Sequence, residues 1–256
     1  MSKFILIGDG AIARYHRKAI EHVGGKLAYV CDPEYGEFNL WKGVPVAKYN
    51  ELPELAGKLW DTDREIYVII ASPSHFHREQ IKFVLKNFPA STQIICEKPA
   101  FLPWEPVIDD DRINICLQLR YLPNLPKKAE NVFVQFVRDN NYFNSWKGDP
   151  QKTGGIFTNL FIHYILLSIQ LKAKFNGIVL LEGTQKRLVD DYDIFNIENQ
   201  YLYNKLYEDI VFSNNGIKPK DIFLLNWILD RSGFKYGFGK DLIGKNIIIN
   251  TQSLSL

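Results

Sequence analysis

The chain has 256 residues, 46% hydrophobic and 14% aromatic, which is enough for one large or two modest packed domains and excludes a disordered protein. Its 31 basic and 29 acidic residues give a net charge of +2 without a block of like charges, so no nucleic-acid or membrane partner is expected. Three scattered cysteines, Cys31, Cys96 and Cys116, lack C-x-x-C spacing and are expected to be reduced thiols of a cytoplasmic protein.

Two apolar segments could suggest a membrane or an export signal. The first, at the N-terminus, has no cleavage site after it and is interpreted as a strand. The second, residues 156–171, is interrupted by Asn159, His163 and Gln170 and is shorter than the roughly 20 residues of a membrane span. A buried helix is expected there.

The first half of the chain alternates short β-branched or aromatic runs with helical patterns. Strands are expected at 3–8, 26–32, 65–71, 92–99 and 112–119, and helices at 11–23 and 74–86. Such alternation is typical of parallel strands covered on both faces. The pattern predicts an α/β fold with an N-terminal Rossmann domain, a doubly wound parallel sheet, over residues 1–118.

The pattern changes after residue 119. A strand with one exposed face is expected at 130–140, the apolar helix at 154–171 and two or three short strands within 177–199. Helices near 200–213 and 219–232 and a strand-like tail at 245–250 follow. Strands grouped with helices in this way predict a smaller α+β second domain over residues 119–256.

The segment "GDGAIA" has the form G-x-G-x-x-A, directly after a strand and at the start of a helix. Gly8 permits a tight turn, Gly10 lets the backbone approach a pyrophosphate, and the helix start at Ala11 and Ile12 offers free N–H groups. Asp32 ends the next strand, where a carboxylate would bind a ribose diol and disfavour a 2′-phosphate. NAD is therefore expected rather than NADP, and the alternative is a glycine turn with an incidental aspartate.

Three basic residues on the following helix, Arg14, Arg17 and Lys18, could favour NADP, but on a helix face they are expected to be solvated. After the strand at 65–71, Ser72 and Pro73 would lie at the carboxyl end of the sheet and line the cofactor cleft.

The pair His75 and His77 suggests a metal, but no third ligand has suitable spacing, so no metal is expected. His77 is expected to cap or pack at the helix start beside the cofactor. The segment "CEKP" closes the strand at 92–99, so Glu97 and Lys98 should emerge where a nicotinamide ring would lie. A solvated lysine beside a proline turn is the alternative.

Asn159 and His163 are spaced i, i+4, so they share one face of the predicted helix. The alternative to a site is a pair of hydrogen-bonded core residues. A glycine pair precedes the helix, and the loop before it carries groups suited to anions and sugars: Trp146, Lys147, Lys152 and Thr153. We therefore expect the polar face to point into a cleft, with His163 as a general base.

Six segments together carry a family resemblance: "FILIGDGAIARYH", "CDPE", "ASPSHFHREQI", "CEKP", "LQLRY" and "SWKGDPQKTGGIFTNLFIHYILL". Over nearly its full length the chain resembles the Gfo/Idh/MocA family of NAD(P)-dependent sugar oxidoreductases. The Ser-Trp-Lys-Gly-Asp loop and the glycine pair before an Asn-bearing helix are similar to one branch of that family. That branch oxidises C3 of UDP-N-acetylglucosaminuronic acid (UDP-GlcNAcA) in the synthesis of surface polysaccharides such as lipopolysaccharide O-antigen.

The resemblance implies that Lys98 and His163 are the catalytic pair, with Asn159 where much of the wider family has aspartate. His163, helped by Lys98, would remove the hydroxyl proton while a hydride passes from C3 to the nicotinamide, and Lys98 would stabilise the developing negative charge. The expected substrate-binding residues are Arg120, Trp146, Lys147, Lys152, Thr153 and Asn159, with a solvated loop as the alternative. A nucleotide sugar is the expected partner.

The chain also departs from the family pattern. Its second domain is shortened at several places between the motifs, and the homo-oligomer that the family implies depends on that domain's sheet. Phe161 replaces a common glycine and could narrow the site. Two alternatives remain: a family oxidoreductase acting on another nucleotide sugar or keto sugar, and an impaired protein that only binds NAD or a nucleotide sugar.

Overall fold

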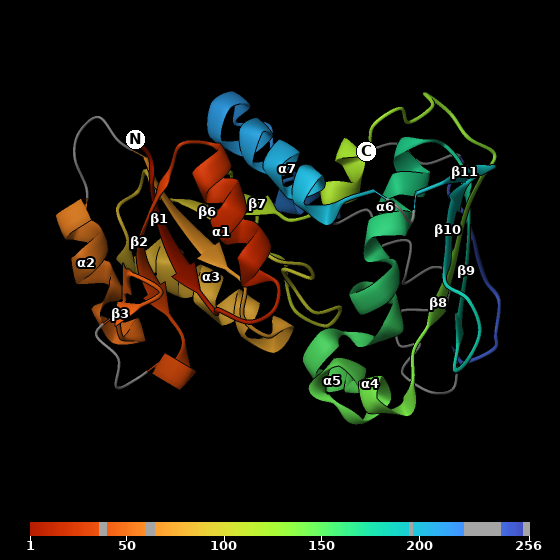
Figure 1. Cartoon of the computed structure of the whole chain (residues 1–256), viewed down its shortest axis with the longest axis horizontal. Coiled ribbons are helices and arrows are strands. Elements are labelled where there is room, and N and C mark those ends of the chain that lie inside the picture. The colour runs from red at the N-terminus through yellow and green to blue at the C-terminus, as the bar shows by residue number, and fades with distance from the viewer. Residues whose placement is uncertain (36–39, 60–64, 195–196, 223–241, 253–256) are drawn as a thin grey trace. The chain divides into compact units, whose positions relative to one another are not determined.

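The computed structural model describes residues 1–35, 40–59, 65–194, 197–222 and 242–252, and the chain divides into two compact units (Figure 1). Unit 1 consists of Met1–Phe101, Val107–Cys116 and Asn199–Pro219. Unit 2 consists of Leu102–Pro106, Leu117–Glu198 and Lys220–Leu256.

Unit 1 is built on a five-stranded parallel sheet with the order β2-β1-β5-β6-β7. The strands are β1 (Lys3–Ile7), β2 (Lys26–Cys31), β5 (Ile66–Ile70), β6 (Gln93–Cys96) and β7 (Ile113–Ile115). All five residues of β5 are buried, as its run of β-branched and aromatic residues predicts for a strand covered on both faces. The expected doubly wound Rossmann sheet is confirmed.

Helices cover both faces of this sheet (Figure 1). Helices α1 (Ala13–His22) and α7 (Asn199–Ser213) pack together on one face, and α3 (His77–Asn87) packs against β5 and β6 on the other. The smaller elements of unit 1 are α2 (Leu52–Leu59), the two-stranded ribbon β3 (Leu40–Trp41) with β4 (Val44–Pro45), and 3₁₀ turns at Pro33–Tyr35, Tyr49–Glu51 and Ser74–Phe76.

Helix α7 joins unit 1, although the sequence placed residues 200–213 in the second domain. Its Tyr203 and Tyr207 are each about 1% exposed or less, and both lie against His16 of α1. The chain returns because two tyrosines one helical turn apart complete the core over α1. The division after Cys116 lies close to the expected boundary at residue 118.

Unit 2 contains a mixed five-stranded sheet with the order β11-β10-β8-β9-β12. The strands are β8 (Asn131–Val137), β9 (Lys174–Leu180), β10 (Lys186–Val189), β11 (Tyr192–Asp193) and β12 (Ile247–Asn250). Strands β8 and β9 are parallel, and the other pairs are antiparallel. In β8 and β9 every second side chain is buried, so one face of the sheet meets the core, as predicted for the α+β domain.

The helices of unit 2 include α4 (Asn140–Asn144), α5 (Pro150–Thr153) and α6 (Ile162–Gln170), with 3₁₀ turns at Gln118–Tyr121 and Trp146–Gly148. The helix expected at 154–171 is present, but Phe157–Phe161 forms a π-helical turn before α6 begins. Of the helix expected at 219–232, residues 223–232 lie outside the described part of the chain.

Phe161 packs in the core of unit 2. It is fully buried, and the centre of its ring lies 5.5 Å from the ring centres of both Phe136 and Phe175. A Cβ on Gly177 would come within 3.0 Å of the Phe161 ring, so this glycine of β9 leaves the space that the ring fills. Within the described residues, no helix is long and apolar enough to cross a membrane.

Candidate functional site

The carboxyl ends of β1 and β5 meet at the point where the strand order of unit 1 reverses, the usual place for a ligand in such a sheet. Gly8 follows β1 with a φ of +88°, a conformation that favours glycine. A Cβ at Gly8 would lie 2.6 Å from the backbone nitrogen of Ser72 and 2.8 Å from the carbonyl carbon of Ala71. The tight turn expected of Gly8 therefore rests on both its dihedral angle and this close approach.

The second glycine of the motif leaves open space. A Cβ at Gly10 would meet no atom within 4 Å, and the Ala13 N–H bonds back to the Gly10 carbonyl oxygen at 3.0 Å. Helix α1 begins immediately after Ala11 and Ile12, so its first N–H groups lie beside this space. An open backbone surface at a helix N-terminus suits a pyrophosphate.

Asp32 stands at the end of β2 beside the glycine turn. Its carboxylate accepts hydrogen bonds from the backbone N–H groups of Asp9 at 2.7 Å and Glu34 at 3.0 Å. A cavity of about 800 Å³ opens there, lined by Asp32, Gly8 and Ser72 together with apolar side chains. Lys48 lines the same cavity. The cavity has the size and mixed lining of a site for the nucleoside part of a dinucleotide.

The middle residue of the glycine turn, Asp9, holds a cluster of donors. Its carboxylate accepts two hydrogen bonds from Arg17, at 2.9 and 2.7 Å, one from Tyr35 at 2.9 Å and one from Trp41 at 3.0 Å. The expectation that Arg17 is solvated is therefore wrong, because the buried carboxylate of Asp9 binds it in a two-pronged ion pair.

Ser72 and Pro73 line the cavity, as expected from their position after β5. His77 does not line it and is buried between two loops. Its Nδ1 lies 2.8 Å from the Pro99 carbonyl oxygen, and its Nε2 lies 2.7 Å from the Ser72 carbonyl oxygen. Burial lowers the pKa of His77, against the effect of these two carbonyls. A neutral ring has one N–H and donates to one of these two carbonyl oxygens, so His77 packs between the cofactor loop and the loop that carries Lys98.

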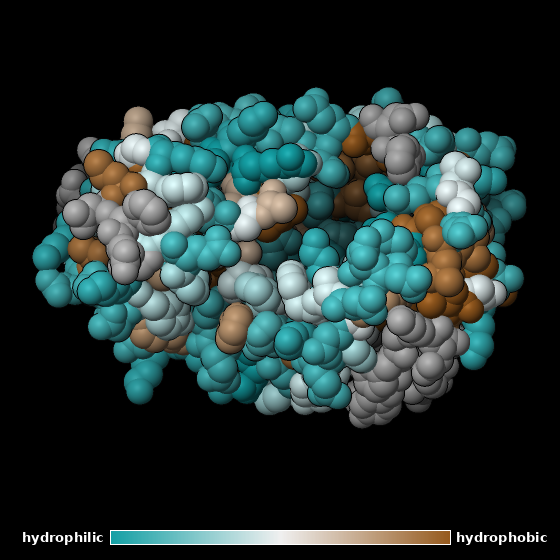
Figure 2. Space-filling view, turned by 60° about the horizontal axis from the view of Figure 1, so that its bottom comes forward, coloured by the Kyte–Doolittle hydropathy of each residue, from teal (hydrophilic) through white to brown (hydrophobic). Residues whose placement is uncertain are grey.

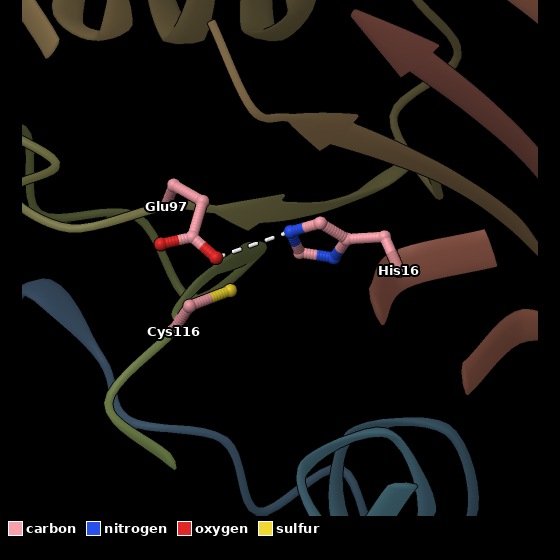
Figure 3. A group of neighbouring side chains, drawn as sticks. All are labelled: His16, Glu97 and Cys116. Atoms are coloured by element: carbon pink, nitrogen blue, oxygen red, sulfur yellow. Dashed lines mark hydrogen bonds and ion pairs between the residues drawn. The ribbon is translucent and has the colours of Figure 1, made fainter. Parts of the chain in front are cut away.

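The Glu97 carboxylate faces the interior of unit 1 (Figure 3). It accepts hydrogen bonds from His16 Nε2 at 3.1 Å and from the Tyr203 hydroxyl, while the Tyr207 hydroxyl lies 2.7 Å from His16 Nδ1. All groups are satisfied when Tyr207 donates to His16 and His16 donates to Glu97. Burial raises the pKa of Glu97, but the bonds from His16 and Tyr203 and the charge of Lys98 outweigh it and lower the pKa to about 2.

The thiol of Cys116 lies beside His16 and Glu97 (Figure 3). The atoms with which these three side chains could bind a metal lie within 4.8 Å of one another. Burial raises the pKa of the Cys116 thiol well above its usual range, which disfavours the thiolate that a metal requires. The nitrogens of His16 are engaged by Tyr207 and Glu97. We interpret the group as a hydrogen-bonded support for the segment that carries Lys98.

Lys98 follows Glu97 directly, and its backbone N–H bonds to the Glu97 carboxylate at 3.3 Å. The Lys98–Pro99 peptide bond is cis, and the Lys98 side chain is half-buried. Glu97, expected as a cofactor ligand, thus directs its carboxylate to the network of His16 and Tyr203. Sequence reasoning missed those two partners, because neither belongs to the glycine or the E-K-P motif.

In unit 2, two left-handed glycines, Gly154 and Gly155, separate α5 from the π-helical turn. Asn159 lies in that turn and is half-buried. Its side-chain amide donates to the Tyr142 hydroxyl at 2.7 Å and to the Lys147 carbonyl oxygen at 3.1 Å. These bonds fix the orientation of the Asn159 side chain. Sequence reasoning missed Tyr142, whose pKa burial raises to about 12.

His163 stands on α6 one turn after Asn159. All the residues from Ile162 to Ile169 are buried except His163, which is half-buried. An α-helix with one partly exposed polar residue among buried neighbours presents that residue at the edge of the core. This placement suits a group that exchanges protons with a ligand.

The remaining expected substrate residues occupy different surroundings. Trp146 and Lys147 are exposed in a 3₁₀ turn capped by Ser145, and Lys152 is exposed in α5, with its ammonium 3.7 Å from Asp149. Thr153 is buried, and its hydroxyl donates to the Asp149 carbonyl oxygen at 2.9 Å. The structure therefore gives Thr153 a role in closing α5. Arg120 is half-buried, and its guanidinium lies 5.3 Å from the centre of the Tyr121 ring.

The fold and the glycine turn define unit 1 as a dinucleotide-binding domain. Residues 2–109 match the model of the Gfo/Idh/MocA family, described as an oxidoreductase family with an NAD-binding Rossmann fold. This part of the chain therefore matches the NAD-binding Rossmann domain of the Gfo/Idh/MocA oxidoreductases, and NAD is its cofactor. The family and the cofactor expected from the sequence are confirmed.

Several solved structures share the fold of the chain. A WlbA (WbpB) dehydrogenase from Thermus thermophilus, in complex with NAD and UDP-GlcNAcA, is 23% identical and has a TM-score of 0.66 over 86% of this chain and 91% of that chain. KijD10, a 3-ketoreductase from Actinomadura kijaniata with NADP and TDP-benzene, is 11% identical, with a TM-score of 0.62 over 91% and 97% of the two chains.

An aldose-aldose oxidoreductase from Caulobacter crescentus is 12% identical, with a TM-score of 0.60 over 96% of this chain and 99% of that chain. At these identities the similarity concerns the fold. A dehydrogenase, a 3-ketoreductase and an aldose-aldose oxidoreductase thus share the fold described for this chain.

Proposed function

We propose that this protein is an NAD-dependent dehydrogenase that oxidises C3 of a nucleotide sugar, UDP-GlcNAcA, to the 3-keto sugar in the synthesis of a surface polysaccharide. The observation that carries the proposal is that Asn159, fixed by two hydrogen bonds, lies one turn before His163, which is half-buried between the buried residues of α6. The Thermus thermophilus enzyme of the same fold, solved with NAD and UDP-GlcNAcA, supports this choice of substrate.

The residues of unit 1 fit a dinucleotide. The open surface at Gly10 and the start of α1 would hold the pyrophosphate, and Asp32 would accept hydrogen bonds from the adenosine ribose. When bound, NAD supplies the hydride acceptor. Arg17 donates two hydrogen bonds to the Asp9 carboxylate, so this arginine does not favour a 2′-phosphate.

His163 acts as the general base in the proposed reaction. As the C3–H bond breaks and its electron pair leaves as hydride, the C3 hydroxyl proton passes to His163 and the C3–O bond becomes a carbonyl. Lys98 stabilises the negative charge that develops on this oxygen, and the buried Glu97 carboxylate holds the backbone of Lys98. Asn159 orients the substrate, while Arg120, Trp146, Lys147 and Lys152 contact its polar groups.

The packing of Phe161 removes the main support for the alternative that the protein is an impaired binding protein. That ring fills space beside Gly177 in the core of unit 2 and does not extend from the surface that carries His163. The alternative of another nucleotide sugar or a keto sugar is retained as an outcome of the experiment below, because a 3-ketoreductase shares the fold.

The proposal includes a cytoplasmic homo-oligomer. The three cysteines are free and buried, which suits a reducing compartment. The face of the unit 2 sheet opposite the core carries partly exposed apolar side chains: Phe133, Val137, Ile178, Leu180, Leu188 and Ile248. Figure 2 shows hydrophobic side chains gathered on the surface over unit 2. Sedimentation analysis tests whether copies of the chain associate.

Single-turnover formation of NADH absorbance, with UDP-GlcNAcA and NAD, tests the function. We expect turnover by the wild type and a decrease of about 10²–10⁴-fold in Lys98→Ala and His163→Ala, with NAD affinity retained. Matched controls are Lys58→Ala and His22→Ala, which remove the same side-chain types from exposed helix positions.

Two results would overturn the proposal. Tight binding of UDP-GlcNAcA without any NADH in the wild type would make the protein a binding module. Turnover with another nucleotide sugar, or reduction of a keto sugar, at a much higher kcat/KM would leave the oxidoreductase and replace its substrate.

A further inference from the structure

Two arginines share one aromatic ring in unit 2. Arg138 follows β8 and Arg187 lies on β10, and their guanidinium carbons lie 4.8 and 5.5 Å from the centre of the Phe136 ring. Arg187 pairs in register with Val134, whose side chain is buried in the core, so Arg187 is on the same face of the sheet as Phe136. This is the face toward α6, because the centres of the Phe136 ring and of the Tyr164 ring on α6 lie 5.7 Å apart.

Arg138 donates hydrogen bonds to neutral groups. Its guanidinium donates to the Val137 carbonyl oxygen at 2.8 Å and to the Gln185 side-chain oxygen at 3.4 Å. The nearby acid, Asp139, accepts the Tyr142 N–H at 2.9 Å as the N-cap of α4. Within the described residues, no ion pair joins Arg138 to a carboxylate.

The two positive charges act on each other. Burial lowers the pKa of Arg138, and the charge of Arg187 lowers it further, against opposing effects of Tyr142, Tyr164 and Asp139. Cation–π contact with Phe136 offsets part of this cost. Both arginines are half-buried, so neither charge is fully solvated. An anion bound by the two guanidinium groups would remove the repulsion and supply charge-assisted hydrogen bonds.

A short chain of contacts connects the arginines with the face that carries Asn159. The Arg138 guanidinium lies 5.4 Å from the centre of the Tyr142 ring, and the Tyr142 hydroxyl accepts the hydrogen bond from Asn159. Tyr164, which both arginines influence electrostatically, is the neighbour of His163 on α6. Strand β8, helix α4, the π-helical turn, α6 and β10 thus bring these groups to one region of unit 2.

We infer that Arg138 and Arg187 form an anion subsite that binds an acidic group of the nucleotide-sugar substrate, either its sugar carboxylate or its diphosphate. The inference rests on the proposed function for the identity of the substrate. Two planar guanidinium groups suit both anions, since each can donate two parallel hydrogen bonds to a pair of oxygens. The exposed Lys147 and Lys152 then have a secondary part in charge recognition.

Calorimetric titration of the NADH-loaded protein tests the subsite with three ligands: UDP-GlcNAcA, UDP-N-acetylglucosamine, which lacks the carboxylate, and UDP. The variants are Arg138→Gln and Arg187→Gln, with Arg138→Lys to test how much of the effect charge alone restores. The matched control is Lys186→Gln, which removes the exposed positive charge next to Arg187 on the opposite face of β10.

We expect a loss of tenfold or more in affinity for UDP-GlcNAcA in both arginine variants, partial recovery in Arg138→Lys and no change in Lys186→Gln. If the loss affects UDP-GlcNAcA alone, the pair binds the carboxylate, and an equal loss for all three ligands assigns it to the diphosphate. Unchanged affinities in both variants would overturn the subsite.

A failure of the proposed substrate gives a different pattern. If the wild type binds none of the three ligands, the same variants are titrated with inorganic pyrophosphate and D-glucuronate. Wild-type binding of either anion that falls tenfold in both arginine variants supports the subsite without the proposed substrate. Absence of binding to both anions, or binding that the substitutions do not change, overturns it. Near-ultraviolet circular dichroism of each variant verifies that unit 2 is folded.

Discussion

The two units build their candidate sites from different materials. In unit 1 the site is largely backbone: the turn at Gly8, the open surface at Gly10 and the first N–H groups of α1. In unit 2 it consists of side chains, such as Asn159 and His163, that depend on neighbours from other elements. A backbone site requires one continuous segment of suitable residues, whereas a side-chain site can be assembled from segments far apart in the sequence.

The largest effect is expected from Gly8→Ala, which tests the backbone site. The new Cβ would stand 2.6 Å from the Ser72 nitrogen at a φ of +88°, so we expect a loss of about 3 kcal/mol or more in unfolding free energy and loss of NAD binding. Urea unfolding and NADH fluorescence measure the two effects. Gly10→Ala is the control, because its Cβ meets open space: it should keep the fold and lose NAD affinity. A stable Gly8→Ala protein that binds NAD would show that the cofactor site of unit 1 does not depend on the backbone turn at Gly8.

Glu97→Gln tests the buried charge of Glu97, which bonds to the backbone of Lys98. Since the folded-state pKa of Glu97 is about 2 and its ordinary value is 4.5, the carboxylate stabilises the fold above pH 4.5 and this contribution is lost as pH falls toward 2. The shift corresponds to about 3 kcal/mol in unfolding free energy. We expect Glu97→Gln to be destabilised by about that amount at pH 7 and to lose this part of the acid dependence.

Denaturant unfolding at a series of pH values measures this effect. Glu54→Gln, which removes an exposed glutamate from α2, is the control and should leave the wild-type pH profile unchanged. An unchanged midpoint for Glu97→Gln at neutral pH would show that the network with His16 and Tyr203 does not stabilise unit 1.

Asp32→Asn tests cofactor choice with little change in shape. The amide keeps an oxygen that can accept the Asp9 N–H, but it removes the charge that would repel a 2′-phosphate, and Lys48 lines the same cavity. We expect the wild type to prefer NADH over NADPH and the variant to lose about tenfold of that preference, about 1.4 kcal/mol. Fluorescence titration with the two reduced cofactors measures it. Equal affinities in the wild type would contradict the assignment of Asp32.

The smallest effect is expected from Asn159→Leu in unit 2. The substitution removes the hydrogen bonds to Tyr142 and Lys147, but the site is half-buried, so water can replace a lost partner and we expect a cost of about 1 kcal/mol. Substrate affinity should fall more than stability does. Denaturant midpoints and calorimetric titration with UDP-GlcNAcA compare the two, and a stability loss of about 3 kcal/mol with unchanged affinity would make Asn159 a core residue.

The predictable part of unit 1 follows from local sequence. The run at residues 66–70 is apolar throughout, and the glycine turn has its required residues within a few positions, so both could be interpreted without distant partners. The bond between Glu97 and Tyr203 spans more than a hundred residues. The i, i+4 spacing of Tyr203 and Tyr207 was the available signal, but it indicates one buried helix face and does not say which helix covers it.

The surroundings of Asn159 and His163 were less predictable. Their shared face was expected from a regular helix, whereas the chain has a π-helical turn at Phe157–Phe161. Such π turns are rare, and the i, i+4 spacing by itself predicts a regular helix. In the structure the Phe161 ring of this turn packs beside Gly177 of β9. Arg138 and Arg187 come together only through the register of β8 with β10, which the sequence does not specify.

The return of α7 to unit 1 determines an order of events during synthesis. Strands β1 to β7 can emerge from the ribosome before residues 199–213 are synthesised. Until then His16 lacks its hydrogen bond with Tyr207, and Glu97 lacks its hydrogen bond from Tyr203. At bacterial or eukaryotic translation rates that interval is on the order of ten seconds. Throughout it the nascent sheet lacks one helix of its cover, and the sheet of unit 2 stays incomplete even longer, because β12 is made after α7. A nascent chain stalled before residue 199 would therefore offer a chaperone the uncovered surface of α1.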